Sequence, residues 1–461
     1  MALETANTLL INLHSDGLPE NIFDWNEIYT EVLKDFTSIE LQADVFYREK
    51  QNAEPLIFSS FVSDLILKRA EQLRLFLKKL ARAIEEFSKL INATPKVTAL
   101  RFLEADSHNQ GEKPVTFHLA KHGYVLKFRD PRPYQILQHV LRFLQTTLQI
   151  ELHSPNIWCA PSNEWHVMPF ITEDNETCHI ESSRFMIRLG AITAVAYFLQ
   201  MTDLHLDNVI VSKGIPIIID PECIFYGYDE YSADTIENRL WNTGLVGEDP
   251  ALSAIRGGSV PIFDFCAKEE QGRITYLRQT SNRYRHRLFD RKGHAVDPVE
   301  FEAEIWDGFS KAYEALCKSK NQLGAEIEIL ALPSMRTRFL LRLTVHYATT
   351  IEILRRPTHE NDTFRLGKLT STFLKSGGMS KLIDDKTKRC ELHDMLGSDF
   401  PFFWTEDIDG SPTLMHWSGN VSKLSDNDSL KNRIKKAITN CSISDLPKLK
   451  TSMNKFFLKE I

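Results

Sequence analysis

Three polar residues in the stretch TDLHLDNVIVSKGIPIIIDPECIF have the types and spacing needed for phosphoryl transfer. Asp203 precedes Asn208 by five positions, and Asp220 ends the apolar run that follows. The same interval separates the base from the metal-binding Asn in the catalytic loop of protein kinases. Phosphoryl transfer needs carboxylate and amide oxygens around magnesium and a carboxylate beside the attacking hydroxyl. The stretch predicts a kinase-like site with Asp203 as the base and with Asn208 and Asp220 as magnesium ligands.

Two further residues of this stretch fit the same chemistry. Glu222 lies two positions after Asp220 and therefore on the same side of an extended backbone, which makes it another candidate metal ligand. His205 stands where protein kinases have a lysine that contacts a phosphate. There is also a purely structural interpretation, because Asp and Asn beside a hairpin commonly form turns and caps. Spacing alone does not decide between the two.

The apolar pattern predicts the elements that position these side chains. Residues 184–201 are apolar on nearly all sides, which indicates a buried central helix directly before Asp203. The runs NVIVS and IPIIID flank a Lys-Gly pair and predict a tight hairpin. That hairpin would bring Asn208 and Asp220 together around a metal ion.

Other segments supply the surroundings of this site. Residues 115–128 contain two short β-prone runs, which predict a hairpin with Lys127 near the end of its second strand. Residues 59–92 have apolar positions at intervals of three and four, as in a long amphipathic helix. Helical patterns dominate again from residue 300, including residues 335–356.

Composition excludes several classes of function. The chain has 461 residues, of which 43% are hydrophobic, and a net charge of −7 without a basic stripe, which argues against a nucleic-acid partner. There is no signal-peptide pattern, and the longest apolar run, residues 189–201, is too short to cross a membrane. The seven cysteines show no paired spacing, which argues against disulfides and zinc and favours a cytoplasmic location.

Four ordered blocks resemble the dehydratase domain of class II lanthipeptide synthetases. The stretch described above matches T-D-x-H-x-x-N followed by I/V-D-x-E. A second block, with D-x-H-N-x-G and a hairpin that ends in Y-K-P-R in the family, corresponds here to LEADSHNQGEKPVTFHLAKHGYVLKFRDPR. A third, a helix with R-x-x-x-R-x-T-x-x-Y, corresponds to LPSMRTRFLLRLTVHYATTIEILRRP. The fourth, L-x-x-G-D-I-P-x-F, corresponds to ELHDMLGSDFPFFW. The resemblance covers about residues 60–425. The residues that match motif positions are Asp106, His108, Lys127 and Arg129 in the second block, Arg338, Arg342, Thr344 and Tyr347 in the third, and Asp399 and Pro401 in the fourth.

The resemblance implies an α+β fold, with a two-lobed core like that of lipid kinases and extensive helical additions. It implies an N-terminal helical region in residues 1–99, a kinase-like core in residues 100–230 and a mainly helical part in residues 231–461 that carries the elimination motif. The implied activity uses ATP and Mg²⁺ to phosphorylate Ser and Thr in a precursor peptide. Phosphate is then expelled to leave dehydroamino acids.

The resemblance also implies roles for single residues. Asp203, His205 and Asn208 serve phosphoryl transfer, Asn208, Asp220 and Glu222 hold magnesium, and Lys127 and Arg129 contact the nucleotide together with Asn208 and Asp220. Asp106 and His108 belong to a loop over the phosphates, where His108 contributes acid or base chemistry. Arg338 and Thr344 serve elimination.

Spacing adds a geometric expectation for the elimination motif. On a helix, Arg338 and Arg342 share a face with Thr344 near the same seam, so their side chains would converge on one phosphate. The alternative is that these arginines are solvated or paired on the surface. Likewise, ADSHNQG is by itself an ordinary turn sequence.

Three functions remain open from the sequence. The first is a free-standing dehydratase, which the presence of Arg338 and Thr344 favours. The chain ends at Ile461 without a cyclase domain, so we expect ring closure to need a separate cyclase. The second is a kinase that phosphorylates a protein or small molecule without elimination. The third is a nucleotide-binding pseudoenzyme, against which the intact Lys127 and Asp203 count.

Overall fold

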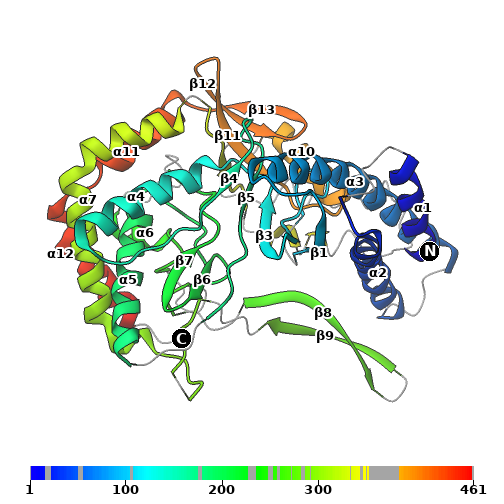
Figure 1. Ribbon diagram of the computed structural model, residues 1–461, viewed down its shortest axis with the longest axis horizontal. Helices are drawn as coiled ribbons and strands as arrows, with labels where there is room; N and C mark the ends of the chain where they lie inside the picture. Colours follow the sequence, from blue (N-terminus) through cyan, green and yellow to red (C-terminus); the bar gives the residue numbers. More distant parts are fainter. Residues whose placement is uncertain are drawn as a thin grey trace.

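Three N-terminal helices begin the chain: α1 (Ala2–Ser15), α2 (Trp25–Glu49) and α3 (Pro55–Leu90) (Figure 1). The computed structural model describes residues 2–15, 22–49, 55–103, 107–174, 179–226, 235–247, 253–256, 260–270, 273–281, 286–290, 292–332, 334–342, 346–348, 350–351 and 384–458. The amphipathic helix predicted for residues 59–92 is confirmed by α3. The apolar residues that recur at helical spacing form one continuous buried face, which includes Leu73, Leu77, Leu80, Ile84 and Phe87.

An antiparallel sheet of five strands follows, in the order β1-β2-β3-β5-β4. The strands are β1 (Val97–Phe102), β2 (Val115–Leu119), β3 (His122–Lys127), β4 (Trp158–Cys159) and β5 (His166–Pro169), and α4 (Arg132–Leu148) lies between β3 and β4 in the chain. The predicted hairpin is confirmed, since β2 pairs with β3 around the turn at Ala120 and Lys121. The sheet shares a hydrophobic core with α1, α2 and α3.

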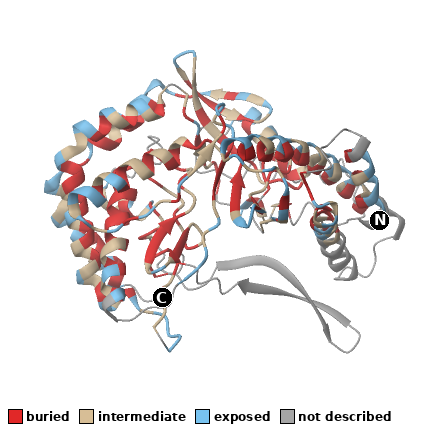
Figure 2. Cartoon of the chain, viewed as in Figure 1, coloured by how far each residue is buried: buried red, intermediate tan, exposed pale blue. Residues whose placement is uncertain are grey.

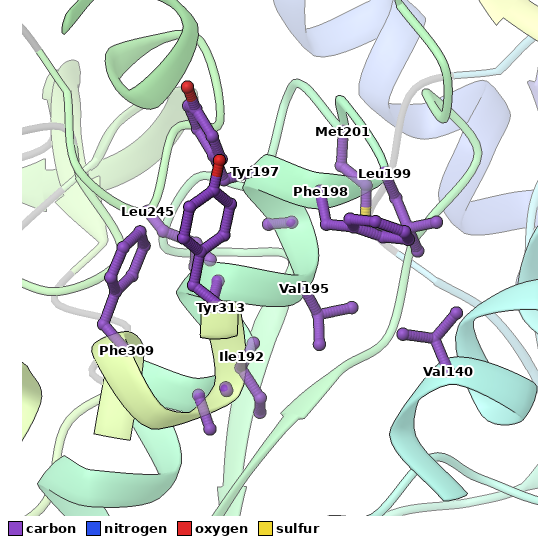
Figure 3. Close-up of a cluster of buried hydrophobic side chains, with 14 of the residues drawn as sticks. Val140, Ile192, Val195, Tyr197, Phe198, Leu199, Met201, Leu245, Phe309 and Tyr313 are labelled. Atoms are coloured by element: carbon purple, nitrogen blue, oxygen red, sulfur yellow. The ribbon is translucent and has the colours of Figure 1, made fainter. Parts of the chain in front are cut away.

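A second core is mainly helical. It is built around α5 (His179–Phe198) and α7 (Glu302–Ala331), with α4 and the C-terminal helices α11 (Leu430–Thr439) and α12 (Leu446–Leu458) beside them. Helices α5 and α7 approach so closely that a Cβ on Gly190 would lie 1.9 Å from the Ile305 carbonyl oxygen. Figure 3 shows Phe309 and Tyr313 of α7 against Tyr197 of α5 in this core. The predicted buried helix is thus confirmed.

The hairpin predicted after this helix is also confirmed. It consists of β6 (Val209–Ser212) and β7 (Ile215–Ile218), with Lys213 and Gly214 in the turn at positive φ. Every residue of β7 is buried, as Figure 2 shows for the region beside α5. The hairpin is therefore held by the helical core, which gives the residues at its open end a rigid support.

The C-terminal part contains more sheet than the sequence predicts. Strands β10 (Thr337–Phe339), β11 (Phe403–Ile408), β12 (Ser411–His416) and β13 (Gly419–Lys423) form an antiparallel sheet, near the top of Figure 1. The helix predicted for residues 335–356 is therefore wrong at residues 337–339, although residues 346–348 are helical. Thr337 and Phe339 pair with Thr405 and Phe403, partners far away in the sequence. Such pairing overrides the local helical pattern.

The remaining described elements are shorter or peripheral. They are α6 (Ile236–Trp241), β8 (Val260–Glu270), β9 (Arg273–Ser281), the 3₁₀ helices η2 (Pro298–Phe301), η3 (Asp426–Asp428) and η4 (Ile443–Asp445), and α10 (Asp385–Leu396). Within the described residues, no helix combines the length and the apolar character needed to cross a bilayer.

Candidate functional site

The loop before β6 and the end of β7 meet at the open end of their hairpin. Val209 pairs with Ile218, and the amide of Ile219 donates to the Asn208 carbonyl oxygen at 3.0 Å. This register sets Asn208 opposite Ile219, the residue before Asp220, at the end of the hairpin that the sequence predicted. The Asn208 side chain also donates to the Asp203 carbonyl oxygen at 2.7 Å and thereby closes the loop.

Asp203 has an unusual backbone conformation, with φ at +65°. Left-handed backbone costs free energy for a residue with a Cβ and is often found at functional sites. Both neighbours are fixed by backbone hydrogen bonds, from Thr202 to Cys223 and from Leu204 to Thr243, each 3.0 Å long. This geometry holds the Asp203 carboxylate 3.9 Å from the His205 ring and 3.8 Å from Arg338.

Lys127 reaches this group from the end of β3. Its buried Nζ lies 3.1 Å from Asp220 Oδ2, and it donates to Tyr134 Oη at 3.0 Å and to the Ile219 carbonyl oxygen at 2.9 Å. Burial raises the pKa of Asp220, although the charge of Lys127 opposes the rise. The structure therefore brings together the strand lysine and the terminal Asp of the hairpin.

One carboxylate oxygen of Asp220 differs from the other, which faces Lys127. Among the described residues, Oδ1 is buried and has no hydrogen-bond partner. An unpaired buried oxygen is costly, and magnesium prefers carboxylate and amide oxygens. Asp220 and Asn208 therefore fit a magnesium site, even though no described group of three His, Cys, Asp or Glu side chains forms a metal cage.

Glu222 has different partners, because two guanidinium groups hold its carboxylate. Arg129 Nε lies 3.0 Å from Glu222 Oε2, and Arg338 Nη1 donates to Oε1. Burial opposes the charge of Glu222, but Arg338 and Arg129 lower its pKa to about 2. Each carboxylate oxygen of Glu222 accepts one of these hydrogen bonds and retains a further lone pair, so the expectation that Glu222 binds a metal ion stays a prediction.

His108 lies beside this arginine pair. Its Nδ1 donates to the Phe400 carbonyl oxygen at 2.9 Å, which leaves Nε2 of the neutral ring with a lone pair. Burial, followed by the charges of Arg129 and Arg338, lowers the pKa of His108 well below its usual value. The ring is therefore neutral at physiological pH and has the form of a base rather than an acid.

Asp399 fixes the loop that carries His108. It accepts hydrogen bonds from Ser107 Oγ at 2.5 Å and from the Gly111 amide at 2.7 Å, and the Phe400 amide donates to the Ser107 carbonyl oxygen at 2.8 Å. The block that contains His108 and the block that contains Asp399 thus contact each other directly. Asp106 and Thr344, which the sequence also indicated, lie outside the described residues.

Arg342 does not join Arg338. Its Nε lies 2.9 Å from Glu391 Oε1 in a fully buried pair, and Tyr347 donates to the same oxygen at 2.7 Å. The expected shared helix face is therefore wrong, because Arg338 lies in β10 and the two arginines belong to different networks. In this structure Arg342 links the segment after β10 to α10.

Several residues of the site carried no clear signal in the sequence. Tyr134 orients Lys127, and His166 donates through Nδ1 to the Arg129 carbonyl oxygen at 3.1 Å. The Phe402 ring lies 4.0 Å from the Arg129 guanidinium and 5.3 Å from that of Arg338. Only Phe402 belongs to a block that the sequence had singled out, and its aromatic run FPFFW was the available signal.

A cavity of about 340 Å³ opens beside the arginine pair. Its lining comes from α3, from the loop after His108, from the end of β3 and from the sheet β10-β11-β12-β13. The lining includes Lys79, Glu112, Arg129, Glu222, Arg336 and Arg338 together with the rings of Phe76, Phe128, Phe402, Trp404 and Trp417. This volume is within the usual range for small-ligand sites, about 300 to 1,000 Å³.

Comparison with known proteins agrees with the sequence motifs. A lacticin 481/lactococcin biosynthesis protein of Lactococcus lactis subsp. lactis is 25% identical over 224 residues. The match covers 42% of this chain and 23% of the length of that relative. It supports the resemblance to class II lanthipeptide synthetases. The model of the family described as domain of unknown function DUF4135 matches residues 57–406, so the chain belongs to the DUF4135 family.

Proposed function

We propose that this protein dehydrates Ser and Thr in a precursor peptide, as the dehydratase part of a class II lanthipeptide synthetase does. ATP and Mg²⁺ would be used in a kinase-like site, and the phosphorylated side chain would then lose phosphate. The observation that carries the proposal is the short segment from Asp220 to Glu222. Lys127 lies 3.1 Å from Asp220, and Arg129 lies 3.0 Å from Glu222, so the residues proposed for phosphotransfer adjoin two arginines suited to bind a phosphate.

Asp203 is the proposed base in the phosphorylation step. Its carboxylate is part-exposed and held by a strained backbone, so it can accept the proton of a peptide hydroxyl as that oxygen attacks the γ-phosphorus. Lys127 would bind nucleotide phosphates in place of its present contact with Asp220. His205 lies 3.9 Å from Asp203 and adds a polar group at the same place.

Asp220 and Asn208 would hold magnesium through the unpaired Oδ1 and the side-chain amide oxygen. Magnesium bound there would neutralise negative charge on the phosphates.

Elimination would use the arginine pair and His108. The Cβ–O bond breaks and its electrons leave with phosphate, while the Cα–H electrons form the double bond and the proton passes to a base. Arg338 and Arg129 are cations suited to receive the departing phosphate. His108 is the proposed base, because its ring is neutral and its Nε2 retains a lone pair.

The test of this function is intact-mass analysis after incubation with ATP and Mg²⁺. The substrates are peptides rich in Ser, Thr and Cys, and the protein itself is included. Loss of water from a peptide supports the dehydratase, whereas stable gain of phosphate indicates a kinase without elimination.

An isosteric variant links the result to the site. Asp220→Asn removes the charge beside Lys127 and should abolish every ATP-dependent mass change. Asp409→Asn is the matched control, because Asp409 is exposed in the β11–β12 turn and Asn tolerates its φ of +49°. Unchanged turnover in Asp220→Asn would refute the assignment.

A further inference from the structure

A single carboxylate, that of Glu222, is shared by the two members of the arginine pair. Arg129 and Arg338 share Glu222, and their additional acidic neighbours are farther away: Glu112 at 3.7 Å from Arg129 and Asp203 at 3.8 Å from Arg338. A phosphate monoester offers three oxygens and nearly two negative charges. It therefore satisfies two adjacent guanidinium groups better than one carboxylate does.

Arg129, Glu222 and Arg338 all line the 340 Å³ cavity. Lys127, Asp203, Asn208 and Asp220 do not belong to its lining, although Asp203 and Asp220 are close to Arg338 and Glu222. Arg338 thus lies 3.8 Å from the Asp203 carboxylate, while both arginines line a cavity that these phosphotransfer residues do not line. A group in the cavity can reach the arginines without occupying the position beside Lys127.

The walls of the cavity suit a phosphorylated side chain and its attached peptide. Phe402 packs on both guanidinium groups and fixes the planes in which their N–H groups point. Phe76, Phe128, Trp404 and Trp417 provide apolar surface around them. Free inorganic phosphate would use the cations alone, whereas a phosphorylated residue would use the rings as well.

We infer that this cavity receives the phosphorylated Ser or Thr side chain of the peptide, whose phosphate takes the place of the Glu222 carboxylate between Arg129 and Arg338. In the present structure Glu222 occupies the position of that phosphate. The inference rests on the proposed function, because it takes the product of the phosphorylation step as its ligand. It gives Glu222 the role of an internal competitor that keeps the arginines paired before phosphorylation.

The test is a calorimetric titration with N-acetyl-O-phosphoserine N-methylamide in metal-free buffer that contains EDTA. Glu222→Gln removes the competing charge and should tighten binding roughly tenfold or more, which corresponds to about 1.4 kcal/mol. A folded Glu222→Gln protein with weaker or unchanged binding would overturn the inference. Thermal melts establish that each variant is folded.

A matched control and a second variant make the result specific. Glu300→Gln removes the same charge from an exposed residue of η2 that does not line the cavity, and binding should stay within about twofold of wild type. Phe402→Leu keeps every charge but loses the ring between the arginines, and binding should weaken about fivefold. Equal binding by Phe402→Leu and wild type would refute the role of the aromatic wall.

Two wild-type measurements decide the question even if Glu222→Gln fails to fold. Saturating ADP should leave the affinity for the phosphoserine derivative nearly unchanged; competition would mean that the ligand occupies the nucleotide site and would overturn the inference. The derivative should also bind more tightly than inorganic phosphate. Equal affinities, or no binding up to about 10 mM, would equally overturn it.

This experiment separates two kinds of failure. Loss of the cavity site with intact ATP-dependent dehydration would overturn only the inference. Absence of any ATP-dependent mass change would refute the proposed function, and the titration would still report whether the arginine pair binds a phosphate monoester.

Discussion

Replacing Asp399 tests how the His108 loop is positioned. The Asp399 side chain is 1% exposed and receives hydrogen bonds from Ser107 Oγ and the Gly111 amide, with Arg69 Nη1 at 3.5 Å. Asp399→Ala removes both acceptors and leaves the Gly111 amide without its partner. Arg69 keeps a second partner, Asp35, at 2.6 Å, which limits the damage.

The magnitude follows from these contacts. Two hydrogen bonds to a charged acceptor would contribute up to about 6 kcal/mol, at about 1.5 to 3 kcal/mol each. Burial raises the pKa of Asp399 despite Arg69 and the hydrogen bonds, so the cost of desolvating the charge offsets much of that gain. We expect Asp399→Ala to lower the free energy of unfolding by about 3 kcal/mol. Asp399→Asn, which retains one acceptor oxygen, should cost about half as much.

Two measurements report on this prediction. Urea denaturation, followed by circular dichroism and tryptophan fluorescence, gives the global change, provided that the two signals coincide. Hydrogen exchange of the segment 107–112 gives the local change, because the Gly111 amide is protected by Asp399 Oδ2. Asp385→Ala is the control, since that side chain is 84% exposed. Unchanged exchange at residues 107–112 in Asp399→Ala would show that Asp399 does not hold the loop.

Three further predictions concern other parts of the molecule. Arg338→Met should slow phosphate elimination by about a hundredfold or more, so that phosphorylated peptide accumulates in mass spectra; complete dehydration at the wild-type rate would contradict its role. Burial opposes the charge of His416, but Asp394 raises its pKa to about 9. The contribution of this pair to the free energy of unfolding should be complete below about pH 6.5 and should fall by up to about 3 kcal/mol as the pH rises through about 9. Urea denaturation of His416→Gln at the same pH values should not show this fall. Gly190→Ala should lower the free energy of unfolding by more than about 3 kcal/mol, because its Cβ would meet the Ile305 carbonyl oxygen; a thermal melt within a few degrees of wild type would refute the close helix contact.

Local patterns determined the elements that carry the phosphotransfer residues. Two short apolar runs on either side of a Lys-Gly turn specify the hairpin of β6 and β7, because its two strands are neighbours in the chain. The spacing of apolar residues likewise predicts α3 and α5. The sequence by itself therefore determined the hairpin that sets Asn208 opposite Ile219, the residue before Asp220, and its ordered motifs pointed to a resemblance that the comparisons support.

Long-range packing decided the rest of the candidate site. Residues 337–339 form a strand only because β11 offers an edge about 65 residues later, and no local signal records that partner. The tertiary structure also decided that Arg338 meets Glu222 while Arg342 meets Glu391. Side-chain direction and burial depend on which elements pack together, so a sequence that names the residue types does not determine which charges become partners.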